Sequence, residues 1–394
     1  MSVLLLIFGL LLFIGLVVAH EWGHFIMARR NGVKVEEFGI FFPPRLFKHK
    51  TKGGWDFTIN LLPLGGFVKL KGEHDTDTAK GSFGAASLKA KSKIMAAGVV
   101  VNLLIALVMF TALAWIGMPK LLPNQFTVKS DTHVIKSELL VGYVEPSSPA
   151  AKLGLKSADK LIAYGTATCR TASGVCTQLH STEQLHDVTH ALGGQAITIE
   201  YQRAGMTRFA TAHLRSSAEV KASEKTDNPK GYLGITTTEY VLQRSTWSAP
   251  VVAVGLSAQA TALTFQGLGK AVAGLGSTIA GAFTNNSTAR HNGQTAASEQ
   301  VSGPVGIFVV LQDGSILGYQ FILLIIAIIS LTLAIMNILP IPALDGGRLW
   351  ITLFTRSIKR PLSPRREELI NASGFVFLLS LIALITFVDI KRFF

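Results

Sequence analysis

The chain has 394 residues, of which 49% are hydrophobic, and its formal net charge is +13. Its mean hydropathy of +0.41 is too high for an ordinary soluble enzyme. The charged residues in its middle exclude a chain that lies wholly in the membrane, so the composition predicts several membrane spans and at least one soluble domain.

The basic residues are concentrated in two short stretches beside apolar segments. Thirteen Lys and Arg residues lie between Arg29 and Lys93 and six between Arg348 and Arg366, whereas the long region from Pro119 to Leu317 holds sixteen. This asymmetry follows the positive-inside rule and assigns both basic stretches to the cytoplasm. The net charge alone would suit nucleic-acid binding, but its distribution argues against that partner and for the lipid bilayer.

The first apolar segment ends in a metal-binding pattern, because residues 3–19 are apolar and His20-Glu21-Trp22-Gly23-His24 follows them. In H-E-x-x-H the two histidines project from one helix face onto a single zinc ion, and the glutamate can act on water. Ionisable groups at membrane depth are costly and indicate a functional site. We assign residues 1–28 to a retained first span with its N-terminus outside, since basic residues follow the apolar run rather than precede it.

Residues 29–93 form a predicted cytoplasmic loop whose apolar centre dips into the membrane. Apolar side chains alternate with mostly polar ones over residues 55–61, which indicates a strand, and Pro63–Gly66 has the composition of a turn. The open edge of such an element beside the first helix could pair with an extended substrate backbone. The alternative is a small β-element without a role in substrate binding. The candidate substrate-binding residues are Gly65, Gly66, Phe67 and Val68.

Residues 94–118 are the predicted second span. Asn102 is its one strongly polar side chain. A hydrogen bond between helices explains this residue as well as a role in the site does.

From residue 127 to residue 236 the composition becomes that of a soluble domain. Residues 141–155 predict a strand, a capped turn and a short helix. Further strands are predicted at 160–164, 195–202 and 208–214, and a helix at 181–192. Ser148-Pro149-Ala150 with Gly154-Leu155 resembles the S-P-A-x-x-x-G-L phrase of PDZ domains in bacterial membrane proteases, although Ala158-Asp159 replaces their usual Gly-Asp. The resemblance implies a groove that binds an extended peptide by strand addition, or a steric filter.

The two cysteines, Cys169 and Cys176, lie in a segment that looks inserted into this domain. An even pair, close in sequence and in an oxidising compartment, indicates a disulfide that closes a small loop. Two unlinked thiols are the alternative. The segment lacks the further His or Cys residues that a structural zinc site requires.

Residues 245–300 are predicted to be an interfacial helical segment and a polar linker. Residues 248–283 have no charge before Lys270 and are rich in Ala and Gly, so a membrane span is the alternative. One extra span would reverse the next helix and carry Asp345 to the membrane face opposite His20. This parity argument favours the interfacial segment.

Residues 316–347 are the predicted third span and end in Asn337 and Leu344-Asp345-Gly346. Two prolines stop the helix and are expected to present Asp345 on irregular backbone. His20, His24 and Asp345 then reach the same membrane face, and two histidines with a carboxylate leave a fourth zinc position for water. The alternative for Asp345 is a helix cap or an ion pair with Arg348. Residues 348–368 form the second basic loop, and residues 369–389 the fourth span.

These patterns together predict a polytopic α-helical membrane protein with four spans, a membrane-associated β-hairpin or sheet, and one extracytoplasmic PDZ domain of α+β type. Together the motifs resemble the bacterial site-2 proteases of the regulator of sigma-E protease type. The resemblance is carried by H-E-x-x-H in the first span, P-L-G-G-F-V at 63–68, the PDZ module, G-P-V-G-I at 303–307, and N-x-x-P-x-P-x-L-D-G-G at 337–347.

The resemblance implies a zinc-dependent intramembrane endopeptidase that cleaves single-span substrates in regulated intramembrane proteolysis. Such substrates are commonly an anti-sigma factor already cut outside, and sometimes signal-peptide remnants. It implies zinc ligation by His20, His24 and Asp345, an acid/base role for Glu21, and contact of Asn337 with the substrate or its oxyanion. It also implies a bacterial inner-membrane location, with the active site near the cytoplasmic side and the PDZ domain outside. Several relatives carry two PDZ domains, whereas this chain has room for one.

Two other classes of function are open to the sequence. A non-catalytic PDZ scaffold has no reason to retain all four residues of the metal site. A zinc transporter should repeat polar residues through several spans, yet the second and fourth predicted spans hold few.

Overall fold

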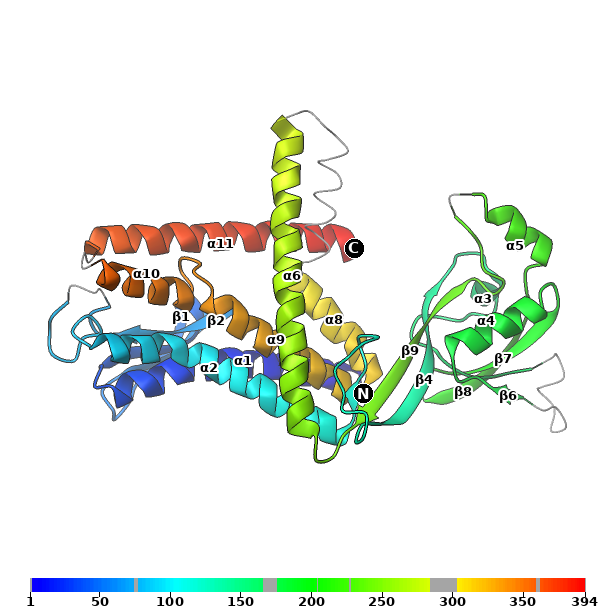
Figure 1. Ribbon diagram of the computed structural model, residues 1–394, viewed down its shortest axis with the longest axis horizontal. Coiled ribbons are helices and arrows are strands. Elements are labelled where there is room, and N and C mark those ends of the chain that lie inside the picture. Colours follow the sequence, from blue (N-terminus) through cyan, green and yellow to red (C-terminus); the bar gives the residue numbers. More distant parts are fainter. Residues whose placement is uncertain are drawn as a thin grey trace. The chain divides into compact units, whose positions relative to one another are not determined.

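A computed structural model describes residues 2–73, 77–165, 176–203, 205–226, 228–283, 303–358 and 362–393 of the chain. The fold divides into two compact units, one formed by Met1–Leu113 with Ala249–Phe394 and the other by Ala114–Ser248. The first unit holds the long apolar helices and a small sheet, and the second holds a larger sheet with short helices (Figure 1).

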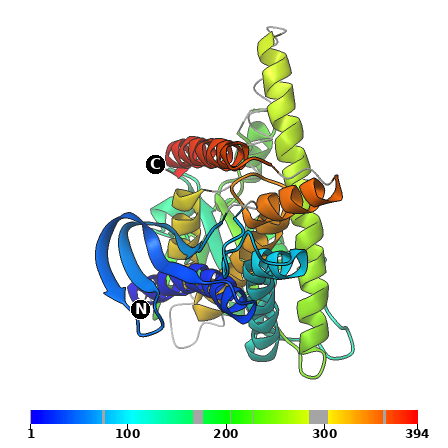
Figure 2. The same cartoon turned by 90° about the vertical axis from the view of Figure 1, so that its left-hand side faces the viewer.

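Within the described residues, five helices are long and apolar enough to cross a membrane. They are α1 (Ser2–Arg30), α2 (Leu88–Ile116), α6 (Ala249–Phe283), α9 (Tyr319–Ile338) and α11 (Pro364–Phe393). The predicted count of four is therefore not confirmed, since α6 also meets these criteria. Its uncharged residues 249–269 extend about 31 Å as a helix, which matches the hydrocarbon thickness. However, α6 runs across the direction of α11 (Figure 1 and Figure 2), as an interfacial helix would, so its interfacial location stays a prediction.

The β-element predicted between residues 29 and 93 consists of β1 (Val35–Lys50) and β2 (Asp56–Leu70). Residues 37–40 pair with 66–69 on one side and with 56–59 on the other, and 56–60 also pair with 45–50. Segments 66–70 and 45–50 are therefore the outer edges. Residues 61–65 are counted within β2, and they carry the chain from one side of residues 37–40 to the other, where it runs in the opposite direction. The chain therefore reverses close to the turn predicted at Pro63–Gly66.

Aromatic side chains pack this sheet against the last turns of α1. The ring centroid of Phe25 lies 5.8 Å from that of Phe38 and 4.9 Å from that of Trp55. Trp22 stacks on Phe25 at 4.8 Å. Packed aromatic pairs of this kind stabilise the contact beyond the apolar area that they bury, so they fix the sheet beside the helix that carries H-E-x-x-H.

The segment predicted as one span over residues 316–347 is divided into separate helices. A shorter apolar helix, α8 (Pro304–Leu317), precedes α9, and Gly318 between them has a φ of 107° that favours glycine. Helix α10 (Asp345–Ser357) occupies the start of the stretch predicted as a basic loop, and α11 begins at Pro364 rather than at residue 369. The loop prediction was wrong because the basic residues are interleaved with apolar ones at helical spacing, and buried Leu349 belongs to the apolar face of α10.

The second unit contains a seven-stranded sheet. Six of its strands follow the order β3-β9-β4-β5-β7-β8, and the seventh, β6, pairs with β5. The predicted strands at 160–164, 195–202 and 208–214 correspond to β5, β7 and β8, and the predicted helix at 181–192 corresponds to α4. Its elements are β3 (Met118–Pro119), β4 (His133–Val144), α3 (Pro149–Lys152), β5 (Lys160–Gly165), β6 (Thr177–Gln178), α4 (Thr182–Ala191), β7 (Ala196–Arg203), β8 (Met206–His213), α5 (Ser217–Ser223) and β9 (Ile235–Arg244).

The core of this unit lies between the sheet and its helices. Leu139, Leu161, Ile197 and Ile199 are fully buried there. Sequence reasoning ended the domain at residue 236 and so missed most of β9, which pairs with β4 along nearly its whole length. The unit is an α+β sheet domain, and its assignment as a PDZ domain stays a prediction.

Buried Asp131 joins the two ends of this unit. Its carboxylate accepts hydrogen bonds from the backbone nitrogens of Thr246 (2.8 Å) and Ser248 (3.0 Å), from the Ser248 hydroxyl (2.6 Å) and from the Thr246 hydroxyl. Burial opposes ionisation of Asp131, but the hydrogen bonds from Ser248 and Thr246 outweigh it and hold the pKa of Asp131 well below its usual range. The carboxylate thereby fixes the chain just before α6 begins.

Candidate metal centre

Helix α1 carries three of the predicted site residues on neighbouring turns. His20 and His24 are four residues apart and project from one helix face, and each exposes only 9% of its surface. Glu21 is half-buried beside them. The backbone of Gly66 in β2 passes close to this glutamate, because a Cβ atom on Gly66 would lie 3.0 Å from Glu21 Cγ.

Asp345 reaches the histidines because the chain turns sharply between α9 and α10. It is the first residue of α10, so the expectation of irregular backbone at this position is wrong. A Cβ atom on Gly346 would collide with the carbonyl oxygen of Leu339, and one on Gly347 would collide with that of Ile341. Both glycines are therefore required for the first turn of α10 to lie on the preceding loop and aim the carboxylate.

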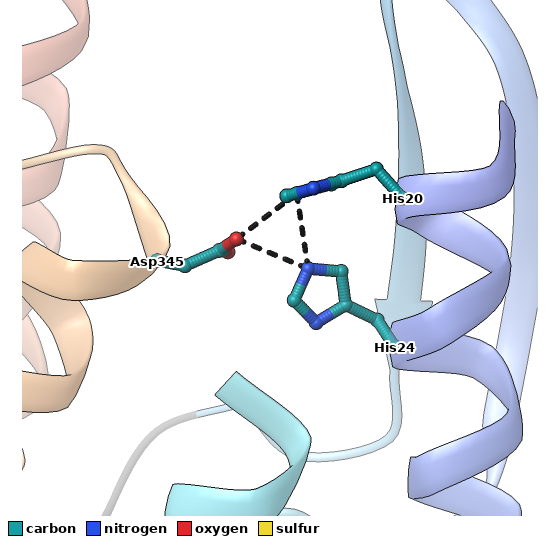
Figure 3. Close-up of side chains that lie close together, drawn as sticks. All are labelled: His20, His24 and Asp345. Carbon is teal, nitrogen blue, oxygen red and sulfur yellow. Dashed lines mark hydrogen bonds and ion pairs between the residues drawn. The ribbon is translucent and has the colours of Figure 1, made fainter. Parts of the chain in front are cut away.

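The two imidazoles and the carboxylate converge on one small space (Figure 3). Asp345 Oδ2 lies 3.0 Å from His20 Nε2 and 3.1 Å from His24 Nε2, and the two Nε2 atoms are 3.2 Å apart. Ligands bound 2.0–2.1 Å from a tetrahedral zinc ion are about 3.3 Å from one another. The donor set therefore fits zinc in both its chemistry and its spacing. Arg348, the alternative partner for Asp345, is instead 3.4 Å from Glu73 Oε2.

The other nitrogen of each imidazole is held by α2. His24 Nδ1 donates to the carbonyl oxygen of Ile94 at 2.8 Å, which leaves the lone pair on Nε2. His20 Nδ1 lies 3.1 Å from Asn102 Nδ2, while the buried Asn102 Oδ1 has no hydrogen-bond partner among the described residues. An amide flip lets Oδ1 accept a hydrogen from Nδ1, so that Nε2 of His20 is also free to bind metal. Of the two explanations left open for Asn102, this contact favours a role in the site.

Gly98 on α2 was missed by the sequence reasoning and lies directly against the centre. A Cβ atom at this position would be 2.6 Å from His20 Nε2 and would also collide with the ring of His24. Only glycine leaves room for both imidazoles. The available signal was the spacing of Gly98 and Asn102, which lie one turn apart on a helix that otherwise holds few polar groups.

The remaining predicted residues meet the centre only in part. Gly66 lies beside Glu21, whereas the ring of Phe67 covers Gly39 of the neighbouring segment and Val68 packs against the core under the sheet. The ring of Phe42 lies over Gly65. Asn337 is half-buried near the end of α9 and takes part in no hydrogen bond within the described part of the chain. Cys169 lies outside the described residues, so its disulfide with Cys176 stays a prediction.

Comparison with known proteins identifies a family for the chain. The model of peptidase family M50 matches residues 8–381. The chain belongs to peptidase family M50. Membership confirms the resemblance to site-2 proteases and makes this M50 chain a membrane-embedded zinc metalloprotease. The enzyme prediction is confirmed over the scaffold and the transporter.

The M50 chain is similar to curated bacterial proteins along its whole length. It is 28% identical to a Clostridium perfringens protein named "Putative zinc metalloprotease", over 98% of each chain. It is 25% identical to zinc metalloprotease RasP of Shouchella clausii, over 96% of this chain and 97% of RasP. It is 23% identical to "Probable protease eep" of Enterococcus faecalis, over 99% of this chain and 98% of that protein.

Proposed function

We propose that this M50 protease is an intramembrane endopeptidase in which His20, His24 and Asp345 bind zinc and Glu21 is the general acid and base. The observation that supports the proposal is the convergence of two imidazoles on a carboxylate at least 321 residues away in the sequence. Three donor atoms lie within 3.2 Å of one another, two on neighbouring turns of α1 and one at the start of α10, and such a group is costly to bury without a bound cation.

The chain's own residues then move the proton. Zinc, when bound, supplies a Lewis acid that polarises the scissile carbonyl group and activates water for attack. Glu21, one residue after a ligand, takes the proton from the attacking water and delivers it to the leaving amine nitrogen as the C–N bond breaks. Glu21 is half-buried on the side of α1 that faces Gly66 of β2, and this position limits the access of bulk water to its carboxylate.

The substrate is a transmembrane segment that unwinds locally, because the peptide bonds of an intact helix are protected by its own hydrogen bonds. Segment 66–70 of β2 pairs on one side only among the described residues and has Gly66 beside Glu21. An extended substrate added to this edge would lie near the general base. The amide of Asn337, which takes part in no hydrogen bond within the described residues, is proposed to contact the substrate or the oxyanion that develops at its carbonyl.

Replacing Glu21 tests the assignment of the general base. We expect Glu21→Gln to reduce cleavage of a single-span substrate in proteoliposomes by about 10²-fold or more, because the isosteric amide cannot accept the proton. Bound zinc should stay at one ion per chain in the variant. Glu183→Gln, at an exposed glutamate of the sheet domain, is the matched control. Undiminished cleavage by zinc-loaded Glu21→Gln would remove Glu21 from the mechanism.

We further propose that the enzyme acts in regulated intramembrane proteolysis at a bacterial inner membrane, on an anti-sigma factor or on signal-peptide remnants. The centre would lie near the cytoplasmic side, and the sheet domain would be an extracytoplasmic PDZ module. Membrane proteomics of cells that carry wild type or Glu21→Gln tests the substrate class: single-span fragments should accumulate only in the variant. Protease treatment of spheroplasts should cut the sheet domain; complete protection would place it on the other side.

A further inference from the structure

The end of the β1–β2 sheet that lies away from the metal centre forms an open, basic pocket. Its volume is about 390 Å³, which is within the range of ligand-binding pockets. All four segments of the sheet end here, so side chains distant in sequence face one space. The lining residues are Lys34, Val35, Glu36, Lys48, Lys50, Gly54, Asp56 and Lys71.

The lining has an excess of positive charge that its own acids do not neutralise. Four lysines and two acids give a net charge of +2, and both acids already have partners. Asp56 binds Lys48 at 2.8 Å, and Glu36 binds Lys69 at 3.3 Å. The hydrogen bond from Lys48, together with the charges of Lys48, Lys50 and Arg45, holds the pKa of Asp56 below its usual value, which reflects a positive local potential.

Three lysines are left with charge for a ligand. Within the described residues, Lys34, Lys50 and Lys71 form no ion pair with a carboxylate. The stem of Lys34 packs against Gly81, where an added Cβ atom would lie 3.3 Å from its Cγ. Among the described residues, the ammonium of Lys71 has only a 3.5 Å contact, with the carbonyl oxygen of Lys80. Lysine donors around an open pocket suit the oxygens of a phosphate group.

The pocket lies at the level where α1 leaves the hydrocarbon. Gly66 lies beside Glu21 on α1, and Lys71 is five residues further along its strand, which corresponds to about 16 Å. Arg30, the last residue of α1, is nine helical residues from Glu21, or about 14 Å. The segment from Gly66 to Lys71 and the segment from Glu21 to Arg30 begin side by side and have similar lengths. Lys71 is therefore at the depth of the basic residues that end α1. Headgroup phosphates occupy this depth.

The end of β1 that carries Lys48 and Lys50 also has exposed apolar residues. Leu46 and Phe47 expose 65% and 51% of their surface, and Lys48 and Lys50 follow directly. Leu61, on the neighbouring strand β2, is 52% exposed. A β-element with an apolar end and a basic end fits a bilayer that meets both, with acyl chains at one end and anionic headgroups at the other. This continuity with lipid selects a headgroup over a soluble phosphate.

We propose that Lys34, Lys50 and Lys71 form a binding site for the phosphate of an anionic phospholipid headgroup at the membrane surface. The bound lipid holds the base of the sheet at the headgroup level and thereby fixes the depth at which the edge strand passes α1. The site does not depend on the identity of the proteolytic substrate or on which leaflet it faces.

The test uses the full chain in nanodiscs that contain phosphatidylcholine and phosphatidylglycerol in a ratio of about four to one. Native mass spectrometry after gentle release measures how many lipids of each kind the chain retains. We expect K34Q/K50Q/K71Q to lower the preference for phosphatidylglycerol by about tenfold or more, since each lysine near an anionic surface contributes about fivefold to association. The charge-preserving variant K34R/K50R/K71R should keep the preference.

The controls separate this site from general charge and folding effects. K152Q/K156Q/K221Q removes three exposed lysines of the sheet domain and should leave the preference unchanged. Each variant must keep wild-type bound zinc and helix content, which shows that the membrane unit is folded. An unchanged preference in folded K34Q/K50Q/K71Q, or an equal loss in the control, overturns the proposal. Hydrogen exchange at residues 48–56 separates the two sources of phosphate. If millimolar inorganic phosphate protected these residues in pure phosphatidylcholine discs as well as phosphatidylglycerol does in the mixed discs, a lipid would not be the ligand.

Discussion

Replacing Gly98 by alanine should disable the metal centre while leaving the fold intact. A Cβ atom at this position would lie 2.6 Å from His20 Nε2, whereas ordinary Cβ contacts begin near 3.4 Å. The nearest atom of that ring, His20 Cε1, would be only 2.4 Å away, so the imidazole must retreat by about 1.0 Å, and His24 Nε2 is equally close to the added methyl group. Zinc–ligand distances tolerate about 0.2 Å, so the shift breaks the ligand geometry. Alanine itself favours a helix by about 1 kcal/mol over glycine, so α2 should form normally.

The assay compares bound zinc and cleavage in purified, reconstituted protein. We expect Gly98→Ala to hold well under one zinc ion per chain and to cleave about 10²-fold more slowly, because misplacement by about 1 Å has an effect of that size. Gly15→Ala is the matched control, since no atom lies within 4 Å of a Cβ at that helical glycine. It should keep zinc and activity. A Gly98→Ala protein with full zinc and wild-type rate would refute the reasoning about the centre.

Three further predictions follow from contacts outside the ligands themselves. Asn102→Leu should weaken zinc affinity about 10- to 100-fold by releasing His20 Nδ1, as measured by chelator competition; an unchanged affinity would show that the amide does not orient the ring. Asp131 has a depressed pKa, so its contribution to stability is present above its unfolded pKa of about 3.9 and is lost as pH falls towards the folded value. The thermal unfolding midpoint of wild type should therefore exceed that of Asp131→Asn at pH 7 and converge with it in acid, and a gap that is constant with pH would contradict this. Asp389 Oδ2 accepts from the backbone nitrogens of Gly303 and Gly306, both at 2.8 Å, so Asp389→Ala should cost about 0.5–2 kcal/mol at the start of α8. Hydrogen exchange at residues 303–306 should accelerate in that variant but not in Asp187→Ala, an exposed aspartate of the sheet domain.

Local patterns carried most of what the sequence predicted. The capped turn at Ser148 and Pro149 forms as expected, with the Ser148 side chain accepting from Ala151 N. The strands β5, β7 and β8 follow from alternation of apolar and polar residues over a few positions. Predictions were wrong where one stretch of sequence had two explanations. The basic residues after Arg348 suggested a loop, whereas the spacing of the apolar residues among them is that of a helix, which is what forms.

The sequence by itself determined that His20 and His24 share one helix face, because an interval of four places them there whatever surrounds that helix. Only the tertiary structure decided that Asp345 meets them, that Asn102 and Ile94 orient the two rings, and that Gly98 leaves them room. These contacts join residues 70 to 325 positions apart, and such proximity depends on how whole helices pack rather than on any local spacing.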